Sequence, residues 1–359
     1  MKQRTISFRL AAAVLVLLMT CAPLEACSLG SRGDAFDIPG FDMRVRDSEA
    51  NAQAALEYLA PDGEISDGWW VPGERTRERW ETLAGSWDSS TLEELTAAMA
   101  AASTMRGSPD EETAAAATWV TARSIEFAVD QVPPKNYTDT MKQNLAALLG
   151  NSPDEVVALA GGESLESSDL YGLSGLVTDA QFETALYRVI DNENAADTLV
   201  TVMLSYHHNQ IDEKIPTAAD PETTLLGLYQ SAAQTMGYLD GITELHTNNN
   251  STSDTINAAD MNTVLTAQAY VDAAQYGLLS EETLEAAATG NNGGPFSFYT
   301  EVDGQPTITA PNPITPETAH SYINWRTLVN DSVMISIDSD INTGHSLGYA
   351  NGQAAEVIK

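Results

Sequence analysis

Cysteine is nearly absent from this chain of 359 residues, which has only Cys21 and Cys27. Both lie close to the N-terminus, so residues 28–359 contain no thiol. That long segment therefore cannot contain a disulfide framework, a cysteine metal site or a cysteine nucleophile. A chain of this length can bury enough apolar surface to fold without such cross-links.

Basic residues are also scarce. The chain has 17 Lys and Arg against 51 Asp and Glu, a net charge of −34. Removing residues 1–26 would take away three basic residues and one acidic residue, leaving −36. Such a body repels nucleic acid and anionic membrane surfaces, so we expect neither as a partner. The acidity fits a solvated surface that keeps an exported protein soluble, with the binding of a cation or a basic partner as the alternative.

No apolar run after residue 27 reaches the roughly 18–20 residues that span a bilayer. Near the N-terminus, three basic residues precede the short apolar run 11–19, and Leu-Glu-Ala-Cys follows at residues 24–27. This pattern resembles the lipobox of bacterial lipoproteins. It predicts a signal peptide over residues 1–26 and a lipid on Cys27 that anchors the protein at the outer face of the cytoplasmic membrane. The alternative is an ordinary signal peptide cut nearby, which also predicts export.

The remainder divides into a tether, a helical domain and a C-terminal part. Residues 27–44 mix Gly, Pro, Ser and Asp without a period, which is typical of a flexible tether. Residues 45–289 carry apolar positions at helical spacing, with polar breaks between them. Residues 290–359 predict a β-hairpin around Asp303-Gly304, followed by helices that pack on the same body. We therefore expect a mainly α-helical, all-α fold with one small hairpin near the C-terminus.

Several predicted helices begin with a hydroxyl residue suited to the N-cap. Ser108 and Ser152 are each followed by Pro and, three positions on, by Glu, which predicts a proline at the first helical position and a capping box. Thr178 and Gln181 predict another capping box, at a helix that does not begin with proline. The β-branched run 333–337 is compatible with either a strand or a helix.

One short segment resembles a hydrolase motif. Gly344-His345-Ser346-Leu347-Gly348 fits the G-x-S-x-G pattern of a nucleophile elbow. An elbow needs a strand directly before it and a histidine and an acid after it, and neither His nor Asp follows Ser346. We favour a helix start or a turn into the last helix, and keep a secreted serine hydrolase as the alternative.

A metal or cofactor site is not expected. Asp338, Asp340 and Asn342 alternate in the manner of a calcium loop, but Thr343 and Tyr349 occupy the positions where an EF-hand has its glycine and bidentate glutamate. A polar loop is the favoured interpretation, with calcium-dependent adhesion or sensing as the alternative. The adjacent His207 and His208 lack the i, i+4 spacing of helical zinc ligands.

Trp69 and Trp70 form the candidate contact surface. Their neighbours Asp67, Gly68 and Pro72 are turn formers, so we expect the pair to be partly exposed in a loop. Exposed aromatic side chains are typical of protein interaction sites.

Residues 42–52 (DMRVRDSEANA) resemble a signature of actinobacterial secreted proteins labelled TPR-repeat-region-containing, a helical group of unsettled function. The resemblance implies a helical cell-envelope protein and carries no catalytic residue. Together with the anchor and the lack of a catalytic constellation, it favours a non-catalytic binding or scaffolding module that contacts a protein partner in the cell envelope.

Overall fold

The computed structural model describes residues 38, 40–42, 48–85, 87–167, 172–251, 255–290, 294–302, 304–311 and 313–358. The proposed lipidation site Cys27, the signal segment 1–26 and most of the tether lie outside these residues. Residues Ile38–Lys359 form one compact unit. No helix of the described part is both long and apolar enough to cross a membrane.

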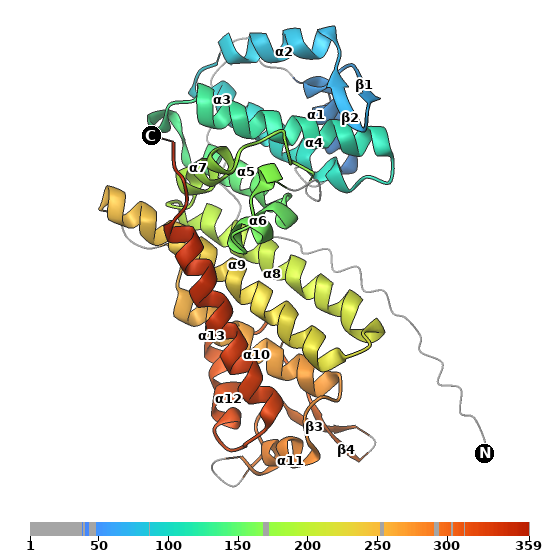
Figure 1. Cartoon of the computed structure of the whole chain (residues 1–359), viewed down its shortest axis with the longest axis vertical. Coiled ribbons are helices and arrows are strands. Elements are labelled where there is room, and N and C mark those ends of the chain that lie inside the picture. The colour runs from blue at the N-terminus through green and yellow to red at the C-terminus, as the bar shows by residue number, and fades with distance from the viewer. Residues whose placement is uncertain are drawn as a thin grey trace, which may run out of the picture. The chain divides into compact units, whose positions relative to one another are not determined.

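The described residues form thirteen α-helices and two small antiparallel hairpins, which confirms the mainly α-helical prediction. Figure 1 shows their arrangement. The helices are α1 (Glu49–Leu59), α2 (Glu74–Gly85), α3 (Ser89–Ser103), α4 (Glu111–Glu126), α5 (Asp139–Gly150), α6 (Pro153–Ala160), α7 (Asp179–Val189), α8 (Glu193–Lys214), α9 (Pro221–Asn250), α10 (Ala258–Gln275), α11 (Glu281–Thr289), α12 (Pro316–Arg326) and α13 (Ser332–Gln353). The strands are β1 (Gly63–Ser66), β2 (Trp69–Pro72), β3 (Tyr299–Val302) and β4 (Gln305–Ile308).

The C-terminal hairpin was predicted from the sequence and the N-terminal one was not. Strands β3 and β4 pair around Gly304, which has the positive φ of 76° that such a turn requires. Strands β1 and β2 pair around Asp67-Gly68, the same dipeptide in a segment that we expected to be a loop. Asp67-Gly68 forms the turn, and the two β-forming tryptophans that follow it continue as the second strand.

The helix caps differ in part from the prediction. The N-cap of α4 is Asp110 rather than Ser108, and its carboxylate accepts a hydrogen bond from the Thr113 amide at 2.9 Å. Ser152 does occupy the N-cap of α6, but its hydroxyl makes no capping bond and contacts the Arg106 guanidinium instead. The capping box of Thr178 is confirmed. A tertiary contact therefore replaced the expected cap of α6, whereas a neighbouring residue replaced the expected cap of α4.

Helices α9 and α13 lie side by side along their length (Figure 1). On α13, Gly344, Gly348 and Gly352 face the α9 backbone, and the absence of side chains there lets the two backbones meet. A Cβ on Gly348 would lie 1.8 Å from the Gln234 carbonyl oxygen. The glycines of the GHSLG segment thus serve helix packing. The segment lies within α13 and not at a helix start, and residues 333–337 are helical.

Candidate functional site

The N-terminal hairpin turns sharply at Asp67-Gly68. Both residues have positive φ, 53° and 84°, as the two central residues of a type I′ turn do. This turn pairs Ser66 with Trp69. Because side chains alternate along a strand, Trp69 and Val71 then lie on one face of the hairpin and Trp70 on the other.

An aromatic cluster holds the inner face of the hairpin. The ring of Trp70 lies 5.1 Å from that of Trp119 on α4, and Trp119 lies 6.0 Å from Trp80 on α2 in an edge-to-face arrangement. The Trp80 indole also donates a hydrogen bond of 2.9 Å to the Leu59 carbonyl at the end of α1. Edge-to-face and tilted ring pairs stabilise beyond the area they bury. The hairpin is therefore fixed to α1, α2 and α4.

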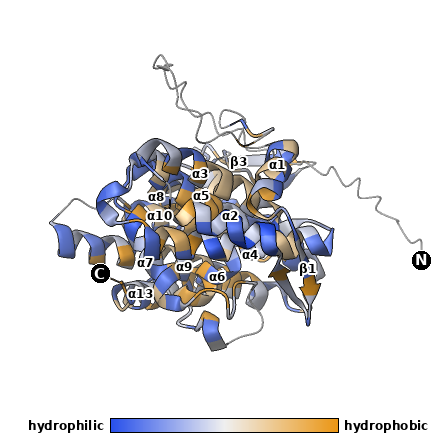
Figure 2. Cartoon of the chain, turned by 90° about the horizontal axis from the view of Figure 1, so that it is seen from above, coloured by the Kyte–Doolittle hydropathy of each residue, from blue (hydrophilic) through white to orange (hydrophobic). Residues whose placement is uncertain are grey.

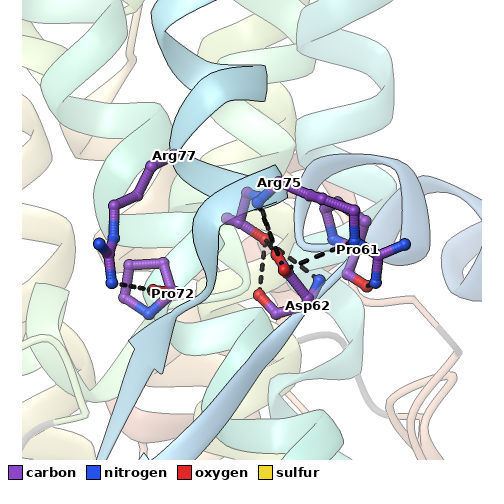
Figure 3. A network of polar contacts seen from close by, with 6 residues as sticks. Pro61, Asp62, Pro72, Arg75 and Arg77 are labelled. Carbon is purple, nitrogen blue, oxygen red and sulfur yellow. Dashed lines mark hydrogen bonds and ion pairs between the residues drawn. The ribbon is translucent and has the colours of Figure 1, made fainter.

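A polar network closes the base of the hairpin (Figure 3). The Asp62 carboxylate accepts hydrogen bonds from the Thr76 amide at 2.8 Å and the Thr76 hydroxyl at 2.9 Å. The Arg75 guanidinium reaches Asp62 at 3.5 Å and donates to the Pro61 carbonyl at 2.9 Å. Desolvation would raise the pKa of Asp62, but the hydrogen bonds from Thr76 and Arg75 together lower it below its usual value. Asp62 therefore stays ionised and ties the start of β1 to the start of α2.

Helix α2 also concentrates arginine in a chain that has little of it. Arg75, Arg77 and Arg79 fall within five positions, although Lys and Arg number only 17 in the whole sequence. Arg77 donates to the Pro72 carbonyl at 2.7 Å, at the end of β2 (Figure 3). Arg75 and Arg77 are both exposed. Each guanidinium has five N–H donors, of which these bonds use one or two, so donors remain for an outside acceptor.

The outer side chains of the hairpin are apolar and exposed. Trp69 is 46% exposed, and Val71 on the same face is 38% exposed. We call these two residues the hairpin surface. Figure 2 shows hydrophobic residues, in orange, on the strands beside the label β1 as well as inside the helical body. Of the two tryptophans that the sequence marked as a contact surface, only Trp69 is exposed, since Trp70 is 7% exposed and packs inward.

The serine of the GHSLG segment does not lie on an elbow. Ser346 is an exposed residue in the middle of α13, and its hydroxyl donates to the Asn342 carbonyl one turn back at 2.8 Å. His345 points its Nε2 toward Asp240 of α9 at 3.5 Å. The strand-to-helix turn that presents an elbow nucleophile is therefore not formed at Ser346.

Asp338 and His207, which the sequence singled out as possible metal ligands, are engaged within the protein. Asp338 accepts a hydrogen bond from the Arg326 Nε at 3.0 Å and another from the Tyr270 hydroxyl, and it lies on α13 rather than in a loop. His207 is buried and lies 3.0 Å from the Thr235 hydroxyl, whereas His208 is exposed. Within the described ranges, no group of three or more potential ligands is placed to hold a metal ion.

The comparison with protein families places this chain. A family model described as a family of unknown function (DUF6571) matches residues 49–255. The chain belongs to this family. The match covers more than half of the sequence and includes the hairpin surface, the aromatic cluster and the Asp62–Arg75 network. No curated protein and no solved structure matches the chain.

Proposed function

We propose that this DUF6571 protein is a non-catalytic binding or scaffolding module of the cell envelope. A lipid on Cys27 holds it at the outer face of the cytoplasmic membrane, and the hairpin surface contacts a protein partner. The observation that carries the proposal is Trp69, a large apolar side chain that is 46% exposed on a hairpin fixed by a tryptophan cluster.

A partner that binds the hairpin surface must offset the entropy that is lost on association. Tryptophan contributes a large contact area at a low entropic cost, and anchored aromatic residues dominate the energetics of many interfaces. The Trp70–Trp119 contact fixes the strand that bears Trp69, so little order is lost when a partner closes on it. Val71 on the same face widens the apolar patch.

The neighbouring charges favour a particular kind of partner. The exposed Arg75 and Arg77 lie at the base of the hairpin, next to the end of β2. There they offer hydrogen-bond donors beside the apolar hairpin surface. A partner with an apolar pocket for the Trp69 indole and carboxylate or carbonyl acceptors at its rim satisfies both features. The strong negative charge of the remaining chain disfavours nucleic acid as that partner.

The test is crosslinking in the native host. A photoreactive amino acid replaces Val71 in the full-length protein, and a second variant carries it at Leu347, which is 50% exposed on α13 and serves as the matched control. The proposal expects one reproducible protein adduct from position 71 that is absent from position 347 and disappears when Trp69→Ala is added. Equal adducts from both positions, or none from position 71, contradict the proposed surface.

The anchor needs its own experiment. Wild type and Cys27→Ala are compared in the membrane and medium fractions of the same host. We expect the wild type in the membrane fraction and the variant in the medium. If both forms fractionate alike, the lipid anchor is wrong, while the crosslinking result still decides the contact surface.

A further inference from the structure

A pocket of about 320 Å³ opens beside the C-terminal hairpin, between its flanking segments and α12. The buried rings of Phe298 and Tyr322 form its inner part, and the exposed Ser297 and Thr309 lie at its rim. This volume is at the small end of the range for small-molecule sites. The pocket is outside residues 49–255, which match the family model.

The apolar wall of the pocket is rigid. Phe298 stacks on Tyr322 with ring centroids 4.1 Å apart and on Phe296 at 5.0 Å. The Tyr322 hydroxyl donates to the Thr309 carbonyl at 3.1 Å, and the Thr309 amide donates to the Phe298 carbonyl at 2.8 Å. These contacts join the hairpin to α12, so the pocket exists before a ligand arrives.

The polar groups of the pocket are hydroxyls. Ser297, Thr309, Thr318 and Ser321 line it together with Tyr322. The side chains of Ser297 and Ser321 make no hydrogen bond to any residue that the structure describes, so both can donate to and accept from a ligand. Burial raises the pKa of Tyr322 to about 12, which keeps its hydroxyl neutral.

Among the residues that the structure describes, none of those lining the pocket carries a carboxylate, ammonium, guanidinium or imidazole group. An anionic ligand would therefore find no counter-charge in a protein whose net charge is −34, and a cation would find no carboxylate. The complement of several uncharged hydroxyls beside an apolar wall is a neutral molecule that has both hydroxyl groups and an apolar face. A pyranose ring has this character and fits the volume of the pocket.

We propose that this pocket binds one neutral pyranose unit, either a free monosaccharide or the terminal residue of a glycan. The rim hydroxyls of Ser297 and Ser321 bond the sugar hydroxyls, and the half-buried Ala310 and exposed Pro311 of the lining contact its C–H groups, above the buried rings of Phe298 and Tyr322. This binding is independent of the hairpin surface.

The test is saturation-transfer difference NMR on the full-length mature protein with four neutral sugars: glucose, galactose, mannose and N-acetylglucosamine. Glucuronate and glucosamine are the charged counterparts. The expected result is saturation transfer from the protein to at least one neutral sugar and weaker transfer to the charged pair. A disaccharide whose terminal residue is the sugar with the strongest saturation transfer distinguishes the two sources. If the pocket binds the end of a glycan, the disaccharide binds at least as well as the free monosaccharide. If it binds a free monosaccharide, the disaccharide binds more weakly.

Two variants and a control locate the binding. Ser321→Leu fills the pocket and is expected to weaken binding at least about tenfold, because the side chain occupies the space of the ligand. Ser297→Ala removes one exposed hydroxyl without a partner in the protein, so the fold stays intact and affinity falls by about three- to tenfold. Asn324→Leu adds a similar side chain on an exposed position of α12 outside the lining and leaves binding unchanged. No transfer to any neutral sugar, or transfer that Ser297→Ala and Ser321→Leu leave unchanged, overturns the proposal.

Discussion

Trp70 on β2 and Trp119 on α4 lie with their ring centroids 5.1 Å apart, at an interplanar angle of 51°. This contact decides which tryptophan of the adjacent pair is available to a partner. Because Trp70 points inward to Trp119, its neighbour Trp69 must point outward. The fold thus buries one of two identical residues that are adjacent in the sequence and exposes the other.

Replacing each member of the pair separately tests this division. Trp70→Ala removes a side chain that is 7% exposed, so we expect a loss of about 3–5 kcal/mol in the free energy of unfolding. Trp69→Ala removes a side chain that is 46% exposed, and we expect the stability to change by less than about 1 kcal/mol. Urea denaturation measures both. If Trp69→Ala lowered the free energy of unfolding as much as Trp70→Ala does, the stability of the protein would depend on the side chains of both faces of the hairpin.

The contact between α9 and α13 leaves no space for a side chain at Gly348. A Cβ on Gly348 would lie 1.8 Å from the Gln234 carbonyl oxygen, which belongs to the backbone and cannot rotate away. Gly348→Ala must therefore push the two helices apart, and we expect it to cost about 3 kcal/mol, at the upper end of the range for overpacking. Thermal and urea unfolding measure the change.

Gly227 is the matched control for this substitution. It lies on α9, and a Cβ there would meet no atom of the described residues within 4 Å. Since alanine favours a helix over glycine, Gly227→Ala is expected to stabilise the protein by about 0.5–1 kcal/mol. The same chemical change should thus have opposite signs at the two positions. If Gly348→Ala and Gly227→Ala both destabilised the protein, or if neither did, the result would contradict the close packing of α9 and α13.

The sequence predicted the helices well because their signals are local. Apolar spacing and caps such as Thr178 depend on residues three or four positions apart, so the local sequence contains both partners; the cap at Ser152 failed because a distant residue, Arg106, takes its hydroxyl. The C-terminal hairpin was predicted for the same reason. Gly344 and Gly348 were interpreted as part of a possible elbow or turn, because the reason for their spacing is α9, which lies about 110 positions away in the chain.

The candidate site was predicted only in part. The sequence marked Trp69 and Trp70 but assigned them to a loop, so it missed the alternation that buries one and exposes the other. The roles of Arg75 and Asp62 were missed because their pairing spans 13 positions. The signal that could have revealed the hairpin was Asp67-Gly68 between β-forming residues, the same pattern that predicted the C-terminal hairpin.

Buried His207 predicts a pH dependence of stability. Burial, together with the charge of Lys214, lowers the pKa of His207 from 6.5 to about 4, so it is neutral in the folded protein at neutral pH. The unfolded chain binds this proton near pH 6.5. The stability contribution is therefore complete above pH 6.5 and is lost as the pH falls toward 4, to the extent of about 3 kcal/mol.

Replacing the histidine isolates this effect. His207→Gln cannot gain the charge, so its free energy of unfolding should fall less steeply than that of the wild type between pH 6.5 and 4. His320→Gln, at an exposed position on α12, should follow the wild-type curve. Urea titrations at half-unit pH intervals give the three curves. Parallel curves for wild type and His207→Gln would show that the imidazole is already charged in the folded state.

The last prediction concerns the contact that displaced the expected cap at Ser152. The Arg106 guanidinium binds the Glu155 carboxylate at 2.5 Å, and the side chains are only 13% and 1% exposed. Glu155 also accepts the Leu173 amide at 3.1 Å. Arg106→Met leaves a buried carboxylate without its counter-charge, so we expect a loss of about 3–5 kcal/mol. The added change Glu155→Gln removes the unpaired charge while keeping an acceptor for Leu173, and should restore more than half of that loss.

An exposed pair in the same protein provides the comparison. Arg123 and Glu126 on α4 form an ion pair whose side chains are 39% and 38% exposed. Arg123→Met should change the stability by at most about 1 kcal/mol, and 1 M salt should remove most of that difference. The effect of Arg106→Met should persist in 1 M salt, because solvent ions do not reach the buried pair. If salt removed both effects equally, the Arg106–Glu155 pair would have to be open to solvent, and its role in joining α6 to the segment after α3 would be wrong.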